Sequence, residues 1–382
     1  MMHEAPIPVV LAGARGHGWW HLQNLRRLSA AGLVRLVGVC DVAPLDPDEL
    51  SGLGAPEQGP DLGELTARTG AEIAIVCTPI HTHTDLALTA ARHGAHVLLE
   101  KPPTPSHAEY ERLVTGIEAT GRACQIGFQS LGSHAITAIR ELIADGSIGA
   151  VRGIGAAGNW VRDEQYFTRA AWSGRRTLAG QAVVDGVLTN PLAHAVATAL
   201  RIDGSDHAED IGSIEPELFR ANAIESDDTS AVRLRTGRGT VVTVAATLCA
   251  ERAADPYVIV HGDKGRITFS YKQDLVLLQR AGRGPQERTY GRTDLLENLV
   301  GHLRHGDALL VPPRATGAFM RVVEAIRTAP DPVPLPGEAW SERDGRRVVA
   351  GVDAMVTASA ERLALFSELG ATWAAPLVSG RG

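Results

Sequence analysis

The chain of 382 residues is 44% apolar and 21% charged, a composition typical of soluble globular proteins. This length predicts two domains rather than one core. The formal net charge of −7 argues against nucleic acid or an anionic membrane as a main partner. No apolar run reaches the roughly 20 residues that cross a bilayer, and residues 1–13 lack the pattern of a signal peptide.

The cysteines predict a cytoplasmic protein. They are Cys40, Cys77, Cys124 and Cys249, which are scattered along the chain and form no Cys-x-x-Cys pair. We interpret them as reduced thiols, mostly in or beside apolar runs, rather than as disulfides or zinc ligands.

Residues 1–130 predict an NAD(P)-binding Rossmann domain, an α/β fold with a doubly wound parallel sheet. Short apolar runs alternate there with helical stretches, which is the pattern of parallel strands joined by helices. The predicted strands are 7–13, 34–41, 73–78, 95–100 and 123–128. The predicted helices between them include 19–31 and 84–93.

Residues 131–382 predict a second α/β domain, for substrate binding and oligomerisation, with a large, mostly antiparallel open sheet. Its strands are longer, and several alternate in polarity as a half-buried sheet does. They lie in 151–161, 229–250, 256–271 and 274–280. Helices are predicted at about 136–145, 191–202, 294–304, 317–328 and 346–369. These helices pack around the sheet or back onto the first domain, and the last one is our candidate for the latter.

A glycine-rich turn, Gly13-x-x-Gly16-x-Gly18, follows the first strand and precedes a helix. Glycines there let backbone amides approach a pyrophosphate at the helix N-terminus. Asp41, at the end of the next strand, would accept hydrogen bonds from the adenosine ribose and repel a 2′-phosphate, so NAD is favoured over NADP. Arg15 would soften this preference by contacting a phosphate. A plain tight turn is the alternative, which the placement of Asp41 makes less favourable.

Lysine is rare here: the chain has 37 basic residues, and the lysines are Lys101, Lys264 and Lys272. Lys101 follows Glu100 at the end of a predicted strand, where ligands of doubly wound sheets gather. A partly desolvated lysine can exchange a proton with a substrate hydroxyl, which a guanidinium cannot. The alternative is a surface lysine paired with Glu100.

The stretch CTPIHTHTDLALTAARHGAHVLLEKPPT, residues 77–104, resembles the signature of the Gfo/Idh/MocA (glucose–fructose oxidoreductase/inositol dehydrogenase) superfamily. The resemblance implies NAD(P)-dependent redox chemistry on sugars, cyclitols or their derivatives, with Lys101 as the catalytic lysine. It also implies that Thr78, Pro79, His83 and Glu100 line the nicotinamide end of the site.

The predicted cofactor-binding set also takes in His17, from the glycine turn, and Gln129, after the last strand of the first domain. The full set is Gly13, Arg15, Gly16, His17, Gly18, Asp41, Thr78, Pro79, His83, Glu100, Lys101 and Gln129. We expect His83 to cap a helix or to touch the cofactor. The pair of His81 and His83 has no accompanying carboxylate or cysteine cluster, so we predict no metal site.

The family's other signature is an Asp-x-x-x-His motif after a glycine-rich stretch, and this chain departs from it. If Asp185 is the acid, the histidine position holds Thr189; if His194 is the histidine, the acid position holds Asn190. We favour the second register because Asn190 and Pro191 suit a helix N-cap and first turn. His194 is then the general base, Asn190 orients the substrate or the lysine, and Asp185 supplies charge nearby. A satisfied histidine on a buried helix face is the structural alternative for His194.

A second loop-rich segment gathers aromatic rings and planar polar groups that suit a carbohydrate. The predicted substrate-binding residues are Asn159, Trp160, Arg162, Tyr166, Trp172, Asn190 and His194. An ordinary loop packed on the sheet is the alternative reading of residues 159–172. Homodimers or homotetramers are implied by the resemblance.

The predicted function is an NAD(P)-dependent oxidoreductase that transfers a hydride between nicotinamide and a secondary hydroxyl of a sugar, sugar derivative or cyclitol. Lys101 and His194 are its predicted acid/base pair. The first alternative is an NAD-dependent glycoside hydrolase of the same superfamily, which oxidises a ring hydroxyl transiently. The second is a cofactor-binding sensor without catalysis, which would be expected to lack the lysine or the base.

Overall fold

The structure is a computed structural model that describes residues 5–374. Residue contacts divide the chain into two compact units. The first runs to Gly132 and includes Thr293–Pro313; the second holds Ser133–Arg292 and the residues from Arg314 onwards. The sequence predicts a single boundary near residue 130. That prediction does not include the return of Thr293–Pro313 to the first unit.

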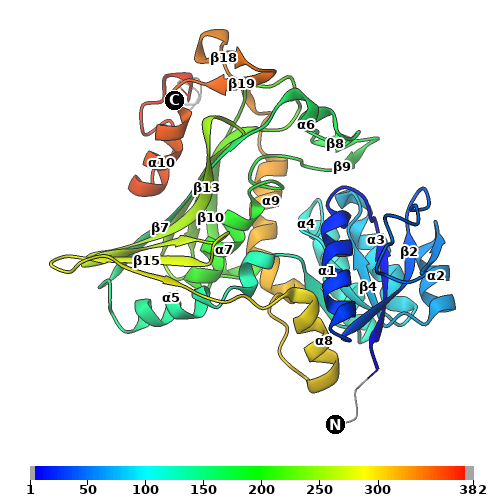
Figure 1. The fold of residues 1–382 in the computed structure, drawn as a ribbon. Coiled ribbons are helices and arrows are strands. Elements are labelled where there is room, and N and C mark those ends of the chain that lie inside the picture. The colour runs from blue at the N-terminus through cyan, green and yellow to red at the C-terminus, as the bar shows by residue number, and fades with distance from the viewer. Residues whose placement is uncertain (1–4, 375–382) are drawn as a thin grey trace. The chain divides into compact units, whose positions relative to one another are not determined.

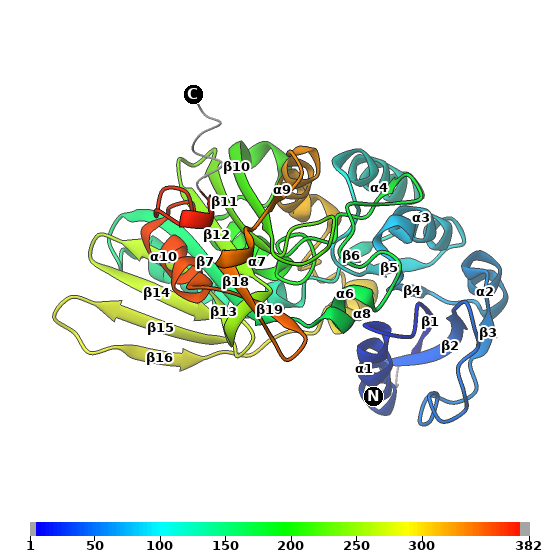
Figure 2. The same cartoon turned by 90° about the horizontal axis from the view of Figure 1, so that it is seen from above.

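The first unit contains a parallel sheet of six strands within the described residues, in the order β3-β2-β1-β4-β5-β6. Figure 1 shows this sheet with its helices, and Figure 2 labels each of these strands. Its strands are β1 (Ile7–Ala12), β2 (Val34–Cys40), β3 (Glu57–Gly59), β4 (Ile73–Val76), β5 (His96–Leu99) and β6 (Cys124–Ile126). Its helices are α1 (Gly18–Ala30), α2 (Leu62–Thr69), α3 (His83–Arg92), α4 (His107–Thr120) and α8 (Leu295–His305). The strand order reverses between β1 and β4, so the carboxyl ends of these two strands mark the position where doubly wound sheets bind ligands.

The second unit contains a mixed sheet of nine strands within the described residues, in the order β16-β15-β14-β13-β7-β12-β11-β10-β17. Most neighbours are antiparallel, whereas β7 with β12 and β10 with β17 are parallel. Its strands are β7 (Val151–Val161), β10 (Ile211–Arg220), β11 (Thr229–Thr236), β12 (Val241–Thr247), β13 (Cys249–Gly262), β14 (Gly265–Ser270), β15 (Leu275–Arg280), β16 (Gln286–Thr289) and β17 (Val333–Pro334). The predicted fold class is confirmed by both sheets.

Helices and two short hairpins complete the second unit. The helices are α5 (Ala135–Ala144), α6 (Glu164–Thr168), α7 (Ala193–Asp203), α9 (Gly317–Thr328) and α10 (Val352–Arg362). The hairpins are β8 (Thr177–Leu178) with β9 (Gln181–Ala182), and β18 (Trp340–Arg343) with β19 (Arg346–Val349). The last predicted helix, 346–369, is therefore too long, because residues 346–349 pair with residues 340–343 as a hairpin.

The last helix covers the sheet of its own unit, as Figure 2 shows for α10 over β7, β12 and β13. Packing around the sheet of the second unit was one of the two predicted arrangements of this helix. The cause is an apolar core on this face in which Phe219, Phe366 and Trp373 pack together, with ring centroids 5.0–6.3 Å apart. Burying these aromatic faces stabilises the helix on its sheet.

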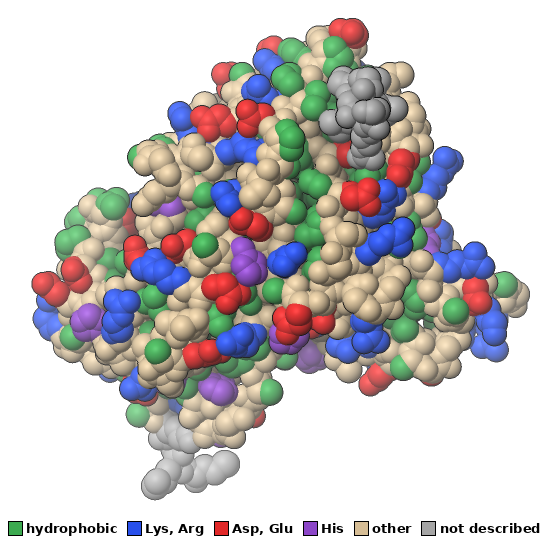
Figure 3. Space-filling view, turned by 180° about the vertical axis from the view of Figure 1, so that it is seen from behind, with side chains coloured by type: hydrophobic (Ala, Val, Ile, Leu, Met, Phe, Trp, Pro, Cys, Tyr) green, Lys and Arg blue, Asp and Glu red, His purple; other side chains and the backbone are tan. Residues whose placement is uncertain are grey.

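Acidic and basic side chains are interspersed on the face shown in Figure 3. Among residues 5–374, no helix has both the length and the apolar character that a membrane span needs.

Candidate functional site

The glycine turn of the first unit has a backbone that side chains would disrupt. Gly13 has a φ of 80°, and a Cβ on it would lie 2.4 Å from the carbonyl oxygen of Cys77. A Cβ on Gly18 would lie 1.9 Å from the carbonyl oxygen of Gly13. These two close approaches require glycine, and they pack β1, α1 and the end of β4 against one another. A Cβ on Gly16 would instead meet open space, although its φ of 60° still favours glycine.

The same turn offers hydrogen-bond donors to an anion. The backbone amides of Arg15, Gly16 and His17 have no acceptor among the described residues, and His17 gives α1 no side-chain cap. Three consecutive donors at the positive end of a helix are the arrangement that holds phosphate groups. The turn therefore fits the pyrophosphate of a dinucleotide.

Asp41 is tied to this turn. One carboxylate oxygen accepts a hydrogen bond from the amide of Ala14 at 2.9 Å, and the other accepts one from Val42 at 2.8 Å. Arg15 lies 3.4 Å from the same carboxylate and donates to the carbonyl oxygens of Ala43 and Pro44. Arg15 is thus bound beside Asp41, which limits the phosphate contact that the sequence predicted for it.

Two loops at the carboxyl ends of β4 and β5 are joined by His83. Its ring is buried, with Nε2 2.8 Å from the carbonyl oxygen of Thr78 and Nδ1 3.0 Å from that of Pro102. Burial lowers the pKa of His83, and a neutral ring donates only one of these bonds at a time. His83 is the first residue of α3 and does not cap it. The ring fixes the loop that carries Lys101, whose peptide bond to Pro102 is cis.

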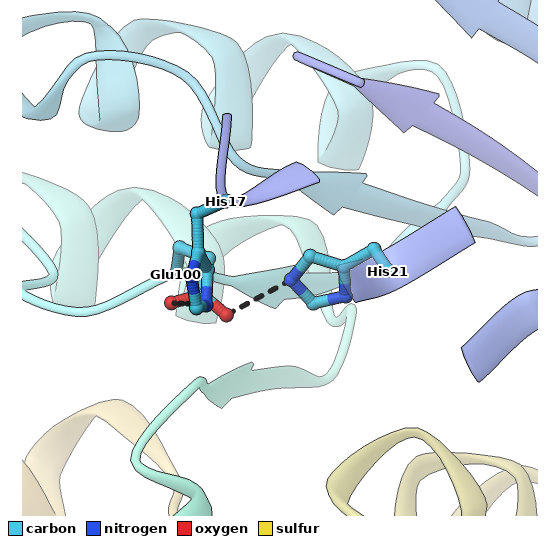
Figure 4. Close-up of side chains that lie close together, drawn as sticks. All are labelled: His17, His21 and Glu100. Atoms are coloured by element: carbon cyan, nitrogen blue, oxygen red, sulfur yellow. Dashed lines mark hydrogen bonds and ion pairs between the residues drawn. The ribbon is translucent and has the colours of Figure 1, made fainter. Parts of the chain in front are cut away.

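The carboxylate of Glu100 is the centre of a buried polar cluster (Figure 4). Its Oε1 lies 2.9 Å from Nε2 of His21 and accepts a hydrogen bond from Nε2 of Gln129 at 3.1 Å. Its Oε2 accepts a bond from the amide of Lys101 at 3.1 Å and lies 3.7 Å from Nε2 of His17. Gln129 is therefore placed beside Glu100, at the end of β5, together with His17 from the glycine turn.

The cluster keeps Glu100 ionised. Burial alone would raise the pKa of Glu100, but the hydrogen bond from His21 and the electrostatic effect of His21, His17 and Lys101 hold it well below its usual range. Ligand atoms of His17, His21 and Glu100 all lie within 4.8 Å of one another, a spacing that a metal ion could bridge. The hydrogen bonds of Glu100 account for its burial without a metal, so we retain the prediction that the site has none.

In the second unit, the segment before α7 brings Asp185 and Asn190 together. The side-chain amide of Asn190 donates to Oδ1 of Asp185 at 2.6 Å, and the amide of Gly174 donates to Oδ2 at 2.7 Å. Val184, just before the carboxylate, has a φ of 44°, which is strained for a β-branched residue. Such strain persists only where surrounding contacts fix the backbone, as they do for this turn.

The predicted helix start is wrong. α7 begins at Ala193 with Leu192 as its N-cap residue, and Asn190 bonds to Asp185 instead of capping the helix. The residues before the helix form turns, in which the amide of Asn190 donates to the carbonyl oxygen of Gly186. The end of the helix is as predicted, with Gly204 in a left-handed conformation.

His194 is the second residue of α7 and is half-buried. Its ring centroid lies 6.5 Å from that of Tyr271, which is buried. Partial exposure distinguishes His194 from its neighbours on this helix, where the residues from Ala195 to Leu200 are buried. Its side chain is thus partly accessible, as a general base requires, while the rest of this helix face is buried.

Aromatic rings and guanidinium groups alternate in a stack within residues 160–172, part of the predicted substrate-binding segment. The stack reaches the turn at Asp185 through Arg169. The guanidinium of Arg162 lies 4.7 Å from the ring of Trp160 and 4.8 Å from that of Tyr166. That of Arg169 lies 3.7 Å from the Tyr166 ring and 3.6 Å from Asp185. We call Trp160, Arg162, Tyr166, Arg169 and Trp172 the cation–π stack.

Asn159 is directed away from the stack. Gly158 faces Leu192, just before α7, since a Cβ on it would meet that side chain at 2.7 Å. Side chains alternate along a strand, so Trp160 shares this face and Asn159 lies on the other. There its amide lies 3.5 Å from the carbonyl oxygen of Asp353 in α10. The prediction that Asn159 binds substrate with Trp160 is therefore not supported by its position.

Comparison with known proteins decides the family. Residues 7–128 match the family described as "Oxidoreductase family, NAD-binding Rossmann fold", and residues 136–268 match its "GFO/IDH/MocA C-terminal domain". Together these matches cover more than half of the sequence. The chain belongs to the Gfo/Idh/MocA family. The resemblance of residues 77–104 is thereby confirmed, as is NAD as the cofactor of this Gfo/Idh/MocA protein.

The Gfo/Idh/MocA chain is 29% identical to scyllo-inositol 2-dehydrogenase (NAD(+)) of Bacillus subtilis, over 38% of this chain and 42% of that one. It is 21% identical to levoglucosan dehydrogenase of Pseudarthrobacter phenanthrenivorans, over 52% and 55% of the two chains. The matches thus span about half the length of these curated relatives. The WlbA dehydrogenase from Bordetella pertussis, solved in complex with NADH and UDP-GlcNAcA, has the same fold, with a TM-score of 0.71, 19% identity and coverage of 84% and 95%.

Two supporting residues of this Gfo/Idh/MocA protein escaped the sequence analysis. His21 lies one turn into α1 and is hydrogen-bonded to Glu100, which is 79 residues away in the sequence. The sequence signals this role only through the position of His21, one helical turn after the glycine-rich stretch. Asp227 is buried and accepts a hydrogen bond from the amide of Val187 at 3.2 Å. A Cβ on Gly186 would lie 2.2 Å from Oδ1 of Asp227, so this carboxylate supports the turn between Asp185 and Asn190.

Proposed function

We propose that this protein is an NAD-dependent dehydrogenase that oxidises a secondary hydroxyl of a sugar, sugar derivative or cyclitol. The observation that carries the proposal is the series of contacts from the cation–π stack through Asp185 to Asn190. These contacts bring a surface suited to binding a carbohydrate next to the turn that precedes His194. Aromatic faces suit the C–H faces of a sugar ring, and planar polar groups suit its hydroxyls. The two relatives, an inositol dehydrogenase and a levoglucosan dehydrogenase, point to the same substrate class.

In this proposal, His194 takes the proton of the substrate hydroxyl as a general base, and Lys101 donates a hydrogen bond to the same oxygen as negative charge develops on it. Asn190 holds the hydroxyl in place through its amide and does not exchange protons. Glu100, held ionised by His21, orients the backbone at Lys101 through the bond to its amide. Bound NAD would accept the hydride, and the amides of Arg15, Gly16 and His17 would hold its pyrophosphate.

The glycosidase alternative has no observation of its own in its favour. The departure at Asn190 left it open in the sequence, but the carboxylate of Asp185 is occupied by hydrogen bonds from Gly174 and Asn190 and by an ion pair with Arg169. Incubation with NAD and a panel of free polyols and glycosides separates the two readings. Net accumulation of NADH supports the dehydrogenase, whereas release of an aglycone without NADH contradicts it.

The roles of the acid/base pair are tested by Lys101→Ala and His194→Ala. Each should lose about 10²–10⁴-fold in turnover, the usual contribution of a general acid or base, while the affinity for NAD stays close to wild type. Lys264→Ala and His305→Ala are matched controls, since both side chains are exposed and neither belongs to the proposed site. Near-normal turnover in Lys101→Ala or in His194→Ala removes that residue from the mechanism.

A further inference from the structure

A cavity of about 830 Å³ lies wholly within the second unit. Its walls are the segment from α6 to Arg175, the loop between β10 and β11, and the β18–β19 hairpin. The proposed dehydrogenase chemistry uses none of the charged side chains that line it. A space of this size accommodates a metabolite-sized ligand.

Three arginines line this cavity without a carboxylate partner. Among the described residues, no acidic oxygen lies within 4.0 Å of the guanidinium of Arg220, Arg346 or Arg347. Arg220 donates to the carbonyl oxygen of Ile224. Arg347 donates to that of Ala221, and Arg346 makes no side-chain hydrogen bond within residues 5–374. All three are half-buried, so solvent screens their charge less than it would on an open surface.

The acids of the same cavity do not offset this charge. Glu225 is committed to Arg175 at 3.2 Å and to the amide of Arg176. Glu164 and Glu342 are exposed, where water solvates their carboxylates. The half-buried part of the wall therefore carries an excess of positive charge.

Two buried polar atoms of this wall lack a hydrogen-bond partner within residues 5–374. Nε of Arg220 and Oγ of Ser173 are buried and have no hydrogen-bond partner among the described residues. A wall on which three guanidinium groups lack described carboxylate partners is suited to a ligand that supplies negatively charged oxygen acceptors.

We propose that this cavity is a binding site for a small anion that carries a phosphate or carboxylate group, with Arg220, Arg346 and Arg347 as its cationic ligands. Guanidinium groups bind phosphate and carboxylate in the same way, through pairs of N–H donors, so a ligand with either group fits this site. The site is separate from the amides of the glycine turn, which belong to the first unit.

Isothermal titration calorimetry of the full chain with inorganic phosphate, and separately with succinate, tests the proposal. NAD is kept saturating to occupy the glycine turn, and ionic strength is held constant with sodium chloride. At least one probe should bind saturably at one site per chain, and Arg346→Gln should weaken this binding at least tenfold. The probe that binds more tightly shows whether the cavity prefers a phosphate or a carboxylate group.

Arg343→Gln is the matched control. Arg343 lies in the same hairpin, but it pairs with Glu251 and does not line the cavity, so its loss should leave binding unchanged. Arg346 holds no side-chain hydrogen bond within residues 5–374, so Arg346→Gln should fold even if Arg347→Gln does not. The proposal is overturned if neither probe binds, which would mean that the cavity holds water only. It is equally overturned if Arg346→Gln and wild type bind with the same affinity.

Discussion

The side-chain amide of Asn190 donates a hydrogen bond of 2.6 Å to the carboxylate of Asp185. In the register that we favour, the acid position of the family's Asp-x-x-x-His pattern holds this amide, and the carboxylate five residues earlier lies against it. The pair carries one negative charge at the turn before His194. The amide of Asn190 is the hydrogen-bond donor of the pair, and the carboxylate of Asp185 is the acceptor.

Replacing Asn190 by Asp should therefore damage the site rather than restore the family pattern. Two carboxylates at hydrogen-bond distance cannot both be ionised, so one must take up a proton or move away. We expect Asn190→Asp to lower kcat/KM by about ten- to hundredfold at neutral pH, equivalent to about 1.4–2.7 kcal/mol. The loss should shrink as pH falls, because protonation of the pair rebuilds the hydrogen bond. Steady-state kinetics from pH 5 to pH 8 measure both effects.

The double variant Asn190→Asp/Asp185→Asn is the control for this prediction. It reverses the donor and acceptor but retains one charge, so it should recover part of the activity that the single variant loses. Arg169 then loses its partner at 3.6 Å, which makes full recovery unexpected. A double variant no better than Asn190→Asp, or a fully active single variant, contradicts this account of the pair.

Glu100 should make stability depend on pH. Its pKa in the folded protein is below the ordinary value of about 4.3, so its contribution is fully present above that value and is lost as pH falls through the folded pKa. At pH 7, Glu100→Gln should thus lower the urea midpoint of unfolding. The difference in this midpoint between the variant and wild type should become smaller as the pH falls toward 3.5. Glu338→Gln is a control, since this side chain is exposed. A difference that is constant between pH 7 and pH 3.5 rules out the ionised cluster.

Local patterns made the first unit predictable. The glycine turn, Asp41 and Lys101 each follow from residues close in sequence, because parallel strands bring their carboxyl ends to one edge of the sheet. His21 and Glu100 are 79 residues apart, and Asp227 supports Gly186 from 41 residues away. No sequence periodicity signals such contacts, because they depend on how separate elements pack.

The second unit shows how tertiary contacts override local preference. Asn190-Pro191 has the chemistry of a helix start, but Asn190 gains a buried carboxylate partner instead, and the helix begins at Ala193. Trp160 and Asn159 are adjacent in sequence, and only the position of Gly158 against Leu192 reveals which of them shares a face with the stack. The joint action of Lys101 and His194 stays a prediction.

Asp41 should set the choice of cofactor. Asp41→Ala removes the carboxylate that would repel a 2′-phosphate, and it leaves the charge of Arg15, 3.4 Å from that carboxylate, available to attract one. We expect the ratio of kcat/KM for NADP over NAD to rise about ten- to hundredfold, which corresponds to about 1.4–2.7 kcal/mol. Arg15→Ala should change the ratio in the opposite direction, because Asp41 then keeps its charge without a cation beside it. An unchanged ratio in Asp41→Ala would show that another residue excludes NADP.

The cation–π stack should contribute to substrate binding more than to the chemical step. Trp160→Ala removes one ring from Arg162 and one apolar face from the proposed sugar surface. We expect KM to rise about tenfold, within the range of about 0.5–1.5 kcal/mol for an aromatic contact, with kcat and the affinity for NAD nearly unchanged. Asn159→Ala is the matched control: it alters the neighbouring residue, whose amide faces α10 on the opposite side of β7, and should leave KM as in wild type. Equal changes in KM for both variants would place the substrate elsewhere, because the two side chains cannot line one face of the same strand.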